Sequence, residues 1–527
     1  MKVKRKLTEN GLSLNGHWRK GIFSFLLSPV FLSIIILLFE VGLLLLIWSA
    51  IGNSLSGYIV GFRTVSVIIL CLFIINSSME SSAKLTWVVF AAIFPFVAGL
   101  FYIFARTSPA KSDTTYCLNV QYEGYKALHP QNHEVLDELL DKDKGSALIA
   151  NYIYGTHCYP IYKNTDVEYF PLGEKKWERM LIDLKKAKKF IFLEYFIIEE
   201  GLMWGKILEI LEEKAKEGLD VRVMYDGTCA MSVLPNNYFK RLRAIGIKSK
   251  VWNPILPLFS SKLNYRDHRK ILVIDNEVAY NGGVNLADEY INHIERFGHW
   301  KDVALRLEGE AVSRFTTMFL SQWHADEEAA SDFSPFLEHK ISKPNEGFLA
   351  PYATNPLNKE KIAEMVYFSI ITGASSYVHI ITPYLILDDE LIAALTTTAR
   401  KGVDVQIIIP GIPDKKAVWA LAKTYYPQLL EAGVKVYEYT PGFTHAKVFV
   451  ADDKRAVVGT INLDYRSLYH HFECGTFLAD TPVVNDIEKD FQETAAKSHL
   501  ITEEDVKKNP KLRKLRGHIM KLVAPLL

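Results

Sequence analysis

The sequence has few cysteines, and none of them are paired at short spacing. Five cysteines are scattered over 527 residues, and no C-x-x-C pair occurs. Clustered cysteines are the usual sign of a structural zinc site or a disulfide framework, so the sequence favours neither. We expect ordinary buried thiols. The five are Cys71, Cys117, Cys158, Cys229 and Cys474.

The chain also lacks an excess of charge of either sign. It has 61 Lys and Arg against 60 Asp and Glu, a formal net charge of +1. Proteins that attract nucleic acid through their overall field are strongly basic, so the composition gives no reason to expect such a partner. An anionic partner would need a local group of cations. The sequence shows no Gly-rich phosphate loop and no cluster of metal ligands, and we expect no metal and no other cofactor.

Long uncharged runs are confined to the first 105 residues. The stretches Ile22 to Phe39 and Leu85 to Ala105 carry no charge. About 20 apolar residues in a helix cross a hydrocarbon core roughly 30 Å thick. Turn-like residues around Asn53 divide the longer first region. The sequence therefore predicts a membrane anchor over residues 1–106 with two or three transmembrane helices, at about 22–49, 57–77 and 85–105.

Basic residues before the first run favour a cytoplasmic N-terminus. With that orientation, three spans would place the rest of the chain outside the cell, and two spans would place it inside. The sequence leaves both arrangements open.

From about residue 107 onward the sequence is typical of an α/β protein that contains a long internal repeat. Glu217–Val221 matches Lys401–Val405 at an offset of 184 residues, and each copy follows a helical stretch. A period of this length indicates duplicated domains. We expect a connecting segment over 107–154, a first domain over 155–340 and a second domain over 341–527.

The second domain ends in a basic amphipathic stretch. Seven Lys or Arg residues between Lys507 and Lys521 alternate with Leu512, Leu515, Ile519 and Leu522. Such a helix can lie on anionic lipid, or it can pack its leucines on the domain. Both interpretations remain open at this point.

Each domain carries the same spaced motif. Both copies read H-x-K-x4-D-x6-G-x-x-N. Alternate residues of a strand point to one face, so each histidine and lysine project side by side. One H-x-K would be an ordinary strand histidine more often than a catalytic one, but two copies inside a separately detected repeat favour chemistry. The copies consist of His268, Lys270, Asp275 and Asn285, and of His445, Lys447, Asp452 and Asn462.

These residue types suit chemistry at phosphorus. Two histidines can divide the work of a nucleophile and of a general acid and base. The lysines and the asparagines Asn285 and Asn462 supply hydrogen-bond donors that bind the phosphate of the substrate without a metal. Asp275 and Asp452 are grouped with the catalytic residues of the motif, although such aspartates more often hold the fold than contact substrate.

The paired motifs resemble those of the phospholipase D superfamily over roughly residues 155–527. Further segments, among them Trp300–Val303, Asn462–Ser467 and Phe472–Glu473, resemble bacterial cardiolipin synthases. The resemblance implies N-terminal transmembrane helices followed by two duplicated phospholipase D-like domains. Each would be a mixed sheet flanked by helices, related to the other by pseudo-twofold symmetry. It further implies a multi-pass protein of the bacterial plasma membrane, with both histidines facing one active site.

The resemblance also implies a reaction. A phosphatidyl group would pass between two phosphatidylglycerol molecules, giving cardiolipin and glycerol through a phosphatidyl-histidine. His268 would be the nucleophile and His445 the acid, although a symmetric motif permits the reverse. Glu194 and Glu473 are candidates for orienting the histidines through the distal ring nitrogen, with burial in a salt bridge as the alternative.

The expected partners are phosphatidylglycerol and other anionic phospholipids. The alternative functions are a hydrolytic phospholipase D and a synthase that uses another alcohol acceptor. An inactive membrane scaffold is a third alternative, and two complete motifs speak against it because binding alone needs neither histidine.

Overall fold

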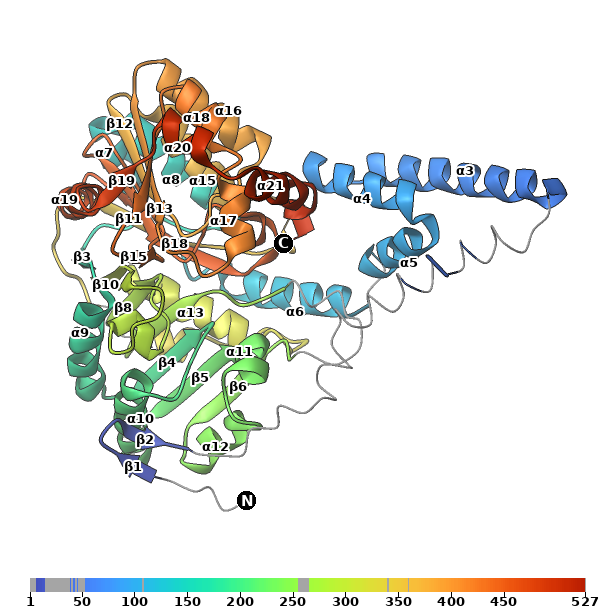
Figure 1. Ribbon diagram of the computed structural model, residues 1–527. Coiled ribbons are helices and arrows are strands. Elements are labelled where there is room, and N and C mark those ends of the chain that lie inside the picture. Colours follow the sequence, from blue (N-terminus) through green and yellow to red (C-terminus); the bar gives the residue numbers. More distant parts are fainter. Residues whose placement is uncertain are drawn as a thin grey trace.

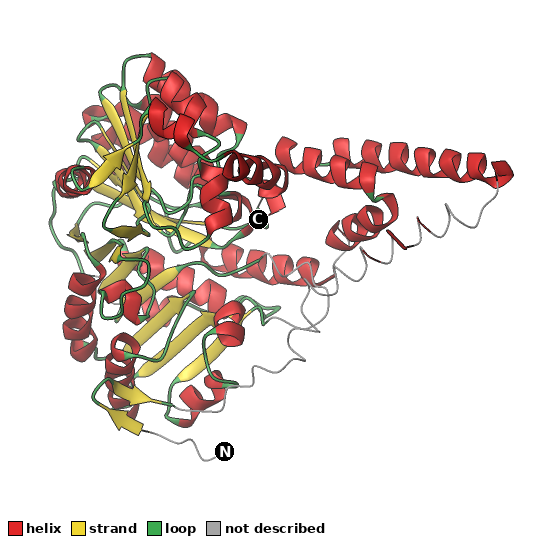
Figure 2. Ribbon diagram, viewed as in Figure 1, coloured by secondary structure: helices red, strands yellow, loops and turns green. Residues whose placement is uncertain are grey.

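The computed structural model describes residues 6–14, 38, 41, 42, 45, 53–106, 109–254, 265–338, 341–358 and 360–526. Two α/β halves are stacked on each other, and an arm of helices projects from one side (Figure 1). Each half is a sheet with helices against it (Figure 2).

The sheet of the first half has seven strands. They are β3 (Thr165–Phe170), β4 (Phe190–Tyr195), β5 (Asp220–Asp226), β6 (Lys248–Trp252), β7 (Lys270–Ile274), β8 (Val278–Gly282) and β10 (Ala304–Gly309). Their order across the sheet is β3-β10-β8-β7-β4-β5-β6. Strands β4, β5 and β6 run parallel, and the remaining pairs are antiparallel, so the sheet is mixed.

The sheet of the second half repeats this arrangement and adds one edge strand. Its strands are β11 (Phe348–Thr354), β12 (Tyr377–Ile381), β13 (Asp404–Pro410), β14 (Lys435–Tyr439), β16 (Val448–Ala451), β17 (Arg455–Gly459), β18 (Glu473–Ala479) and β19 (Ser498–Leu500). The order β11-β18-β17-β16-β12-β13-β14-β19 matches the first sheet strand for strand up to β14. The predicted duplication of a mixed sheet is therefore confirmed.

Helices cover the sheets and fill the space between them. They are α6 (Pro109–Lys126), α7 (His133–Lys142), α8 (Lys144–His157), α9 (Gly173–Lys186), α10 (Leu202–Lys216), α11 (Gly227–Ser232), α12 (Tyr238–Ala244), α13 (Val312–Trp323), α14 (Ser334–Leu337), α15 (Ile362–Gly373), α16 (Asp389–Arg400), α17 (Lys416–Ala422), α18 (Tyr426–Glu431), α19 (Val483–Ala495), α20 (Glu503–Lys508) and α21 (Lys511–Val523). All of α13 is buried, because it packs on strands of both sheets.

The two halves share one large hydrophobic core. It joins Phe192 and Phe319 of the first half to Tyr367 and Phe449 of the second. The predicted connecting segment over 107–154 contributes to this core, since it forms the three helices α6 to α8 and buries Ile153 completely. The two halves therefore pack together as one unit and are not independent domains joined by a linker.

A short N-terminal hairpin packs on the first half. Strands β1 (Lys6–Thr8) and β2 (Gly11–Ser13) pair with each other, and β2 lies against α10. The Ser13 hydroxyl and the Leu14 amide both donate to Glu200, at 2.6 and 2.8 Å. A Cβ at Gly11 would lie 2.4 Å from the backbone of Gly205, so the hairpin and the helix touch backbone to backbone.

The projecting arm consists of α3 (Asn53–Ile75), α4 (Ser81–Ile93) and α5 (Pro95–Arg106). The prediction of a single helix over 85–105 is wrong, because the helix is interrupted at Phe94, between α4 and α5. Proline disfavours helical backbone at the residue before it, and Pro95 begins α5. The predicted span at 22–49 falls almost wholly outside the described residues. Among the described residues, no helix is both long enough and apolar enough to cross a membrane.

Candidate active site

The two H-x-K pairs lie at the beginnings of equivalent strands, and each is attached to the opposite half. The amide of His268 donates to the carbonyl of Phe472 at 2.9 Å, and the amide of His445 donates to the carbonyl of Lys301 at 2.7 Å. Strand β15 (Gly442–Thr444), which leads into the second motif, pairs in parallel with β9 (His299–Lys301) of the first half. This exchange of backbone bonds brings both motifs to the boundary between the halves.

Each histidine is hydrogen-bonded by a carboxylate from the other half. Nδ1 of His268 lies 2.8 and 2.9 Å from the two carboxylate oxygens of Glu473. Nδ1 of His445 lies 2.7 Å from Oδ2 of Asp302. Both carboxylates are fully buried. A carboxylate accepts a hydrogen bond from Nδ1–H, so each ring keeps its proton on Nδ1 and its Nε2 is free to react.

Asp302 and Glu473 occupy equivalent positions in the two sheets. Ala304 pairs with the motif glycine Gly282, and Gly475 pairs with the motif glycine Gly459. The two acids each lie two residues before these partners. The structure thus places the predicted Glu473 beside His268 and adds Asp302, which the sequence interpretation quoted without assigning it a role.

Glu194, the other predicted histidine-orienting residue, contacts neither ring. Its carboxylate lies 3.5 Å from the Arg269 guanidinium, on the side of the sheet opposite to the motif pair. The reason is the two-residue period of a strand: Arg269 stands between His268 and Lys270 and faces the other way. That prediction is wrong, and the salt-bridge alternative describes Glu194 correctly.

The two motif lysines are buried cations beside the histidines. Nζ of Lys270 donates to the carbonyl of His268 at 2.6 Å, and Nζ of Lys447 donates to the carbonyl of His445. Burial lowers the pKa of Lys270 to about 8 and that of Lys447 to about 7. The site therefore concentrates positive charge that an anionic group can neutralise.

The histidines are neutral in the free site. Burial and Lys270 lower the pKa of His268 well below its usual range, and the nearby His471, Lys447 and His445 add to this effect. Burial and Lys447 lower the pKa of His445 to about 4. His445 and Lys447 are therefore near enough to His268 to act on its charge.

The two carboxylates differ in acidity. Burial acts to raise the pKa of Asp302, but His445 and Lys447 outweigh it and the pKa is lowered. Burial raises the pKa of Glu473 well above its usual range, and the Thr460 hydroxyl donates to that carboxylate. Asp302 is thus the stronger stabiliser of a protonated ring.

The motif asparagines are only partly available for substrate. The Asn285 oxygen accepts from the amide of Ile197 at 3.1 Å, and its nitrogen donates to the Tyr290 hydroxyl at 2.7 Å. The Asn462 nitrogen donates to Asp464 at 3.1 Å, and its buried oxygen has no hydrogen-bond partner in the part of the chain that the structure describes. Each amide nitrogen keeps one further N–H for a phosphoryl oxygen.

The motif aspartates lie at the far ends of their strands. The Asp275 carboxylate accepts from the backbone amides of Lys188, Lys189 and Phe190 at 2.7 to 2.8 Å. The Asp452 carboxylate likewise accepts from the amides of residues 375–377 at 2.8 to 3.0 Å. Asp275 lies five positions beyond Lys270 along the strand, about 16 Å. Grouping the aspartates with the catalytic residues is wrong, and they instead fix the turns that begin β4 and β12.

A third histidine lies next to the nucleophile candidate. The rings of His471 and His268 are 5.6 Å apart. Nδ1 of His471 lies 3.6 Å from Oε1 of Glu473 and has no hydrogen-bond partner among the described residues. His268, His471 and Glu473 bring ligand atoms within 4.8 Å of one another, so this set could hold a metal ion. The surrounding cations Lys270 and Arg266 oppose a divalent ion there and favour an anion.

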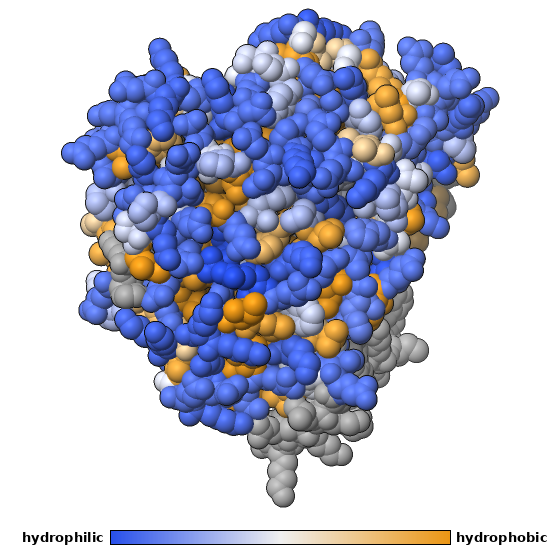
Figure 3. Space-filling view, turned by 90° about the vertical axis from the view of Figure 1, so that its left-hand side faces the viewer, coloured by the Kyte–Doolittle hydropathy of each residue, from blue (hydrophilic) through white to orange (hydrophobic). Residues whose placement is uncertain are grey.

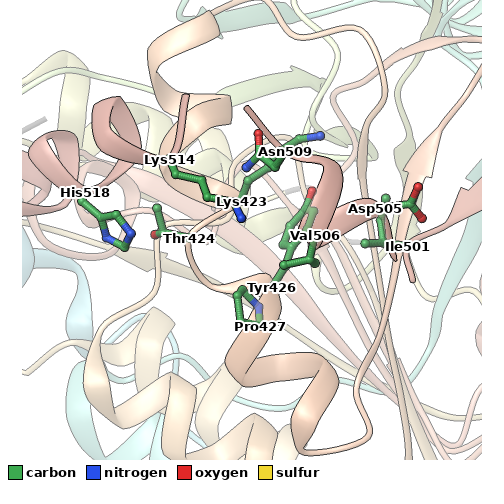
Figure 4. Close-up of a pocket in the computed structure, with 10 residues that line it drawn as sticks. All are labelled: Lys423, Thr424, Tyr426, Pro427, Ile501, Asp505, Val506, Asn509, Lys514 and His518. Atoms are coloured by element: carbon green, nitrogen blue, oxygen red, sulfur yellow. The ribbon is translucent and has the colours of Figure 1, made fainter. Parts of the chain in front are cut away.

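A cavity of about 120 Å³ lies outside this site. It is lined by residues of the second half between α17, α18, α20 and α21, among them Lys423, Lys514 and His518 (Figure 4). Lys423 is already paired with Glu438 at 2.9 Å. None of the histidine–carboxylate pairs lines this cavity.

Comparison with known proteins identifies the family. The family model described as "Cardiolipin synthase, PLD-like domain" matches residues 180–323 and 367–495, which are the two halves around the two motifs. The chain belongs to the cardiolipin synthase family. It is 33% identical to the cardiolipin synthase of Alkalihalophilus pseudofirmus over 468 residues, covering 88% of this chain and 93% of that protein.

The chain is also similar to a second cardiolipin synthase, to an uncharacterized protein and to one solved structure. The chain is 31% identical to the cardiolipin synthase of Geobacillus kaustophilus over 505 residues, covering 93% of this chain and 98% of the relative. It is 51% identical to an uncharacterized protein of Streptococcus mutans, covering 86% of this chain and 99% of that protein. The fold is similar to a phosphatidylserine synthase of Haemophilus influenzae, with a TM-score of 0.56, 17% identity and coverage of 73% and 100% of the two chains. As a cardiolipin synthase family member, the protein is a phosphatidyltransferase of the phospholipase D-like type.

Two residues of this cardiolipin synthase site were missed by the sequence interpretation. Asp302 follows the motif asparagine by 17 residues, whereas Glu473 follows its asparagine by 11, so the equal spacing that revealed the motifs fails here. Other acidic residues, Asp288 and Asp464 among them, stand closer to the motif asparagines, so no simple sequence signal marks Asp302. His471 has no equivalent in the first half and carried no signal.

In this cardiolipin synthase fold, replacing Asp275 with asparagine tests its structural role. The amide keeps one accepting oxygen, so one or two of the three bonds from backbone amides are lost and the remainder weaken because the acceptor is no longer charged. We expect the free energy of unfolding to fall by about 2–4 kcal/mol, because bonds to an ionised acceptor are the strong ones. Thermal denaturation measures this loss, while activity per folded molecule stays within a few-fold. A large loss of activity with an unchanged melting temperature would return Asp275 to the catalytic set.

Proposed function

We propose that this enzyme joins two phosphatidylglycerol molecules into cardiolipin and glycerol through a phosphatidyl-histidine on His268. The observation that carries the proposal is the pair of hydrogen bonds that His268 donates to Glu473 and His445 donates to Asp302. They leave one free Nε2 on each ring. Two such nitrogens beside buried lysines provide a nucleophile, an acid and an anion-binding site together.

The reaction has two displacement steps. In the first, Nε2 of His268 forms a bond to phosphorus, the bond from phosphorus to the glycerol oxygen breaks, and His445 gives its proton to that oxygen. In the second, a hydroxyl of another phosphatidylglycerol loses its proton to His445 and attacks phosphorus. The phosphorus–nitrogen bond then breaks and His268 is restored.

The charges of the site support this division of roles. A lowered pKa keeps His268 neutral, so its lone pair is available for attack. His445 must carry a proton, and the anionic phosphodiester offsets the lysine charges that otherwise lower its pKa. Asp302, whose pKa is lowered, stays ionised and stabilises the imidazolium of His445.

The phosphate would be bound by Lys270 and Lys447, with one N–H each from Asn285 and Asn462. These donors lie where negative charge grows in the transition state. One phosphodiester replaces another, so the exchange has little net driving force. Burial of the site, which limits the entry of water, favours transfer over hydrolysis.

Labelled phosphatidylglycerol tests the function directly. Membranes that contain the protein should convert the label to cardiolipin and release one glycerol for each cardiolipin formed. Label that appears only in phosphatidic acid would make the enzyme a hydrolytic phospholipase D. Label that appears only when another alcohol is added would make it a synthase with a different acceptor.

The lysine pKa values predict how the reaction depends on pH. Because the pKa is lowered to about 7 for Lys447 and about 8 for Lys270, both charges are present below these values and are lost as pH rises through them. We expect kcat/KM, which reports the free enzyme, to fall above about pH 8. In a Lys447→Arg variant the remaining activity should decline only at higher pH, since arginine stays charged. A rate that is constant between about pH 6 and about pH 9 would contradict the assignment.

We also propose that the enzyme is a multi-pass protein of the bacterial plasma membrane, where its lipid substrates lie. The uncharged sequence runs before residue 106 support this location. The β1–β2 hairpin packs on the first catalytic half, so residues 6–14 and the site lie on the same side. If the two ends of the anchor lie on the same side, the chain crosses the membrane an even number of times. This favours two transmembrane helices over three. Carbonate extraction of the full chain tests membrane integration, and a soluble protein would contradict it.

A further inference from the structure

The C-terminal helix α21 presents basic and apolar side chains to the outside. Its 13 residues include five Lys or Arg and neither Asp nor Glu. Four large apolar side chains on it are exposed, from 41% for Leu522 to 78% for Leu512. Residues 512, 515, 519 and 522 follow the spacing that aligns side chains along one face of a helix. They form an exposed apolar stripe.

The opposite face of α21 is fixed on the second half. A Cβ at Gly517 would lie 2.4 Å from the carbonyl oxygen of Ala420, so α21 meets α17 backbone to backbone. The guanidinium of Arg513 lies over the Trp419 ring at 4.9 Å. These contacts prevent the helix from turning its leucines toward the domain. The alternative in which the leucines pack on the domain therefore does not describe this helix.

The apolar stripe continues onto the projecting arm. The hydroxyl of Thr86 in α4 donates to the carbonyl of Leu522 at 2.7 Å, and the neighbouring Leu85 is 60% exposed. The exposed apolar side chains of α3 are Tyr58, Val60, Phe62, Val65, Ile68, Ile69, Leu72, Phe73 and Ile75. Helices α3 and α4 lie side by side, and α21 meets α4 at the base of the arm through the short helix η4 (Ala524–Leu526) (Figure 1). On the face shown in Figure 3, by contrast, hydrophilic side chains cover most of the surface.

We propose that α21 docks on the surface of a bilayer that contains anionic phospholipid. Leu512, Leu515, Ile519 and Leu522 would enter the interface, and Lys511 and Arg516 on either side of them would reach the phosphates. A helix of this kind lies in the plane of the membrane, and each basic residue strengthens its binding to an anionic surface about fivefold. A second copy of the chain is a poorer partner, since two surfaces with the same cations repel each other.

The charges on α21 are free to meet such a surface. Among the described residues, Lys511 and Arg516 form no ion pair with a carboxylate, whereas the neighbouring Lys507 and Lys508 of α20 are paired with Glu503 and Glu504 at 3.4 and 3.3 Å. The two lysines of α20 therefore provide a matched control. This inference holds whichever phospholipid the enzyme transfers.

Hydrogen exchange of the full-length protein tests the docking. Compared with the protein in detergent, the backbone amides of α21 should exchange more slowly when the protein is reconstituted into vesicles of phosphatidylcholine with phosphatidylglycerol, and should be little changed in vesicles of phosphatidylcholine alone. In a Lys511→Gln/Arg516→Gln variant, about 25-fold more anionic lipid should be needed for the same slowing. The Lys507→Gln/Lys508→Gln variant should behave as the native protein does.

Three results would overturn the proposal. They are no slowing with anionic vesicles, equal slowing with phosphatidylcholine alone, and an equal loss in the control variant. Slowing that needs no lipid and grows with protein concentration would instead identify a face for a second copy. The readout does not use turnover, so it stays informative even if the proposed reaction is wrong. Transfer activity on detergent-dispersed substrate should be the same in both variants, which shows that they are folded.

Discussion

Replacing His268 with asparagine is expected to lower cardiolipin formation by about 10⁴- to 10⁶-fold, the range that follows loss of a covalent nucleophile. Asparagine keeps the polarity of the site but cannot form the bond to phosphorus. The loss should appear in kcat with folding unchanged, because His268 touches its neighbours mainly through its backbone amide and its ring contact with Glu473. Product analysis with labelled phosphatidylglycerol measures it.

The His445→Asn variant is the matched comparison that separates the two roles. A substrate whose leaving group is a nitrophenol departs without a proton, so this variant should still form the phosphatidyl-histidine from it. The His268→Asn variant should not. Acid-labile label bound to the His268→Asn protein, and absent from the His445→Asn protein, would reverse the assignment. Failure of both proteins to bind label would argue against a covalent intermediate.

Replacing Asp302 with asparagine should lower kcat by about 10³- to 10⁴-fold, although Asp302 does not touch the substrate. An amide can donate to Nδ1 of His445 and so stabilise the wrong tautomer, with the proton on Nε2. It also removes the charge that stabilises the imidazolium. Asp302 is a positioning residue, so its loss should also change the pH profile of kcat.

The Glu194→Gln variant is the control for this change. Glu194 is as buried as Asp302, and in both variants a carboxylate is replaced by an amide of nearly the same shape. Glu194, however, contacts Arg269 and neither histidine. Activity per folded molecule should stay within about tenfold, with the pH profile unchanged. An Asp302→Asn protein that keeps its full activity, or that loses no more than the Glu194→Gln protein, would rule out the positioning role.

The duplicated fold and the heart of the site could be predicted from sequence because both depend on short-range patterns. Strand periodicity sets the direction of His268 and Lys270, and the equal spacing of the second motif shows that the pattern is repeated. The strand expected at the first motif is present, since Lys270 begins β7. These features are local, so local rules are sufficient for them.

The features that failed depend on contacts between distant segments. Asp302 was missed because the first half inserts β9 between the motif asparagine and the acid, which changes the spacing. A short helix follows the asparagine in both halves, η2 (Asp288–Ile291) in the first and η3 (Arg466–His470) in the second. Glu194 was misassigned because the sequence does not reveal which face of β4 it occupies. The role of Asp275 becomes visible only when the turn before β4 folds back onto it.

Each half of the chain supplies the carboxylate that serves the histidine of the other. The two halves therefore complete each other's site as the two subunits of a dimer can, except that here they are covalently joined in one chain. Neither half is self-sufficient, and a substitution in one half takes effect at the histidine of its twin. Because each histidine depends on the carboxylate of the opposite half, both halves must keep their site residues. The loops between those residues can still differ in length.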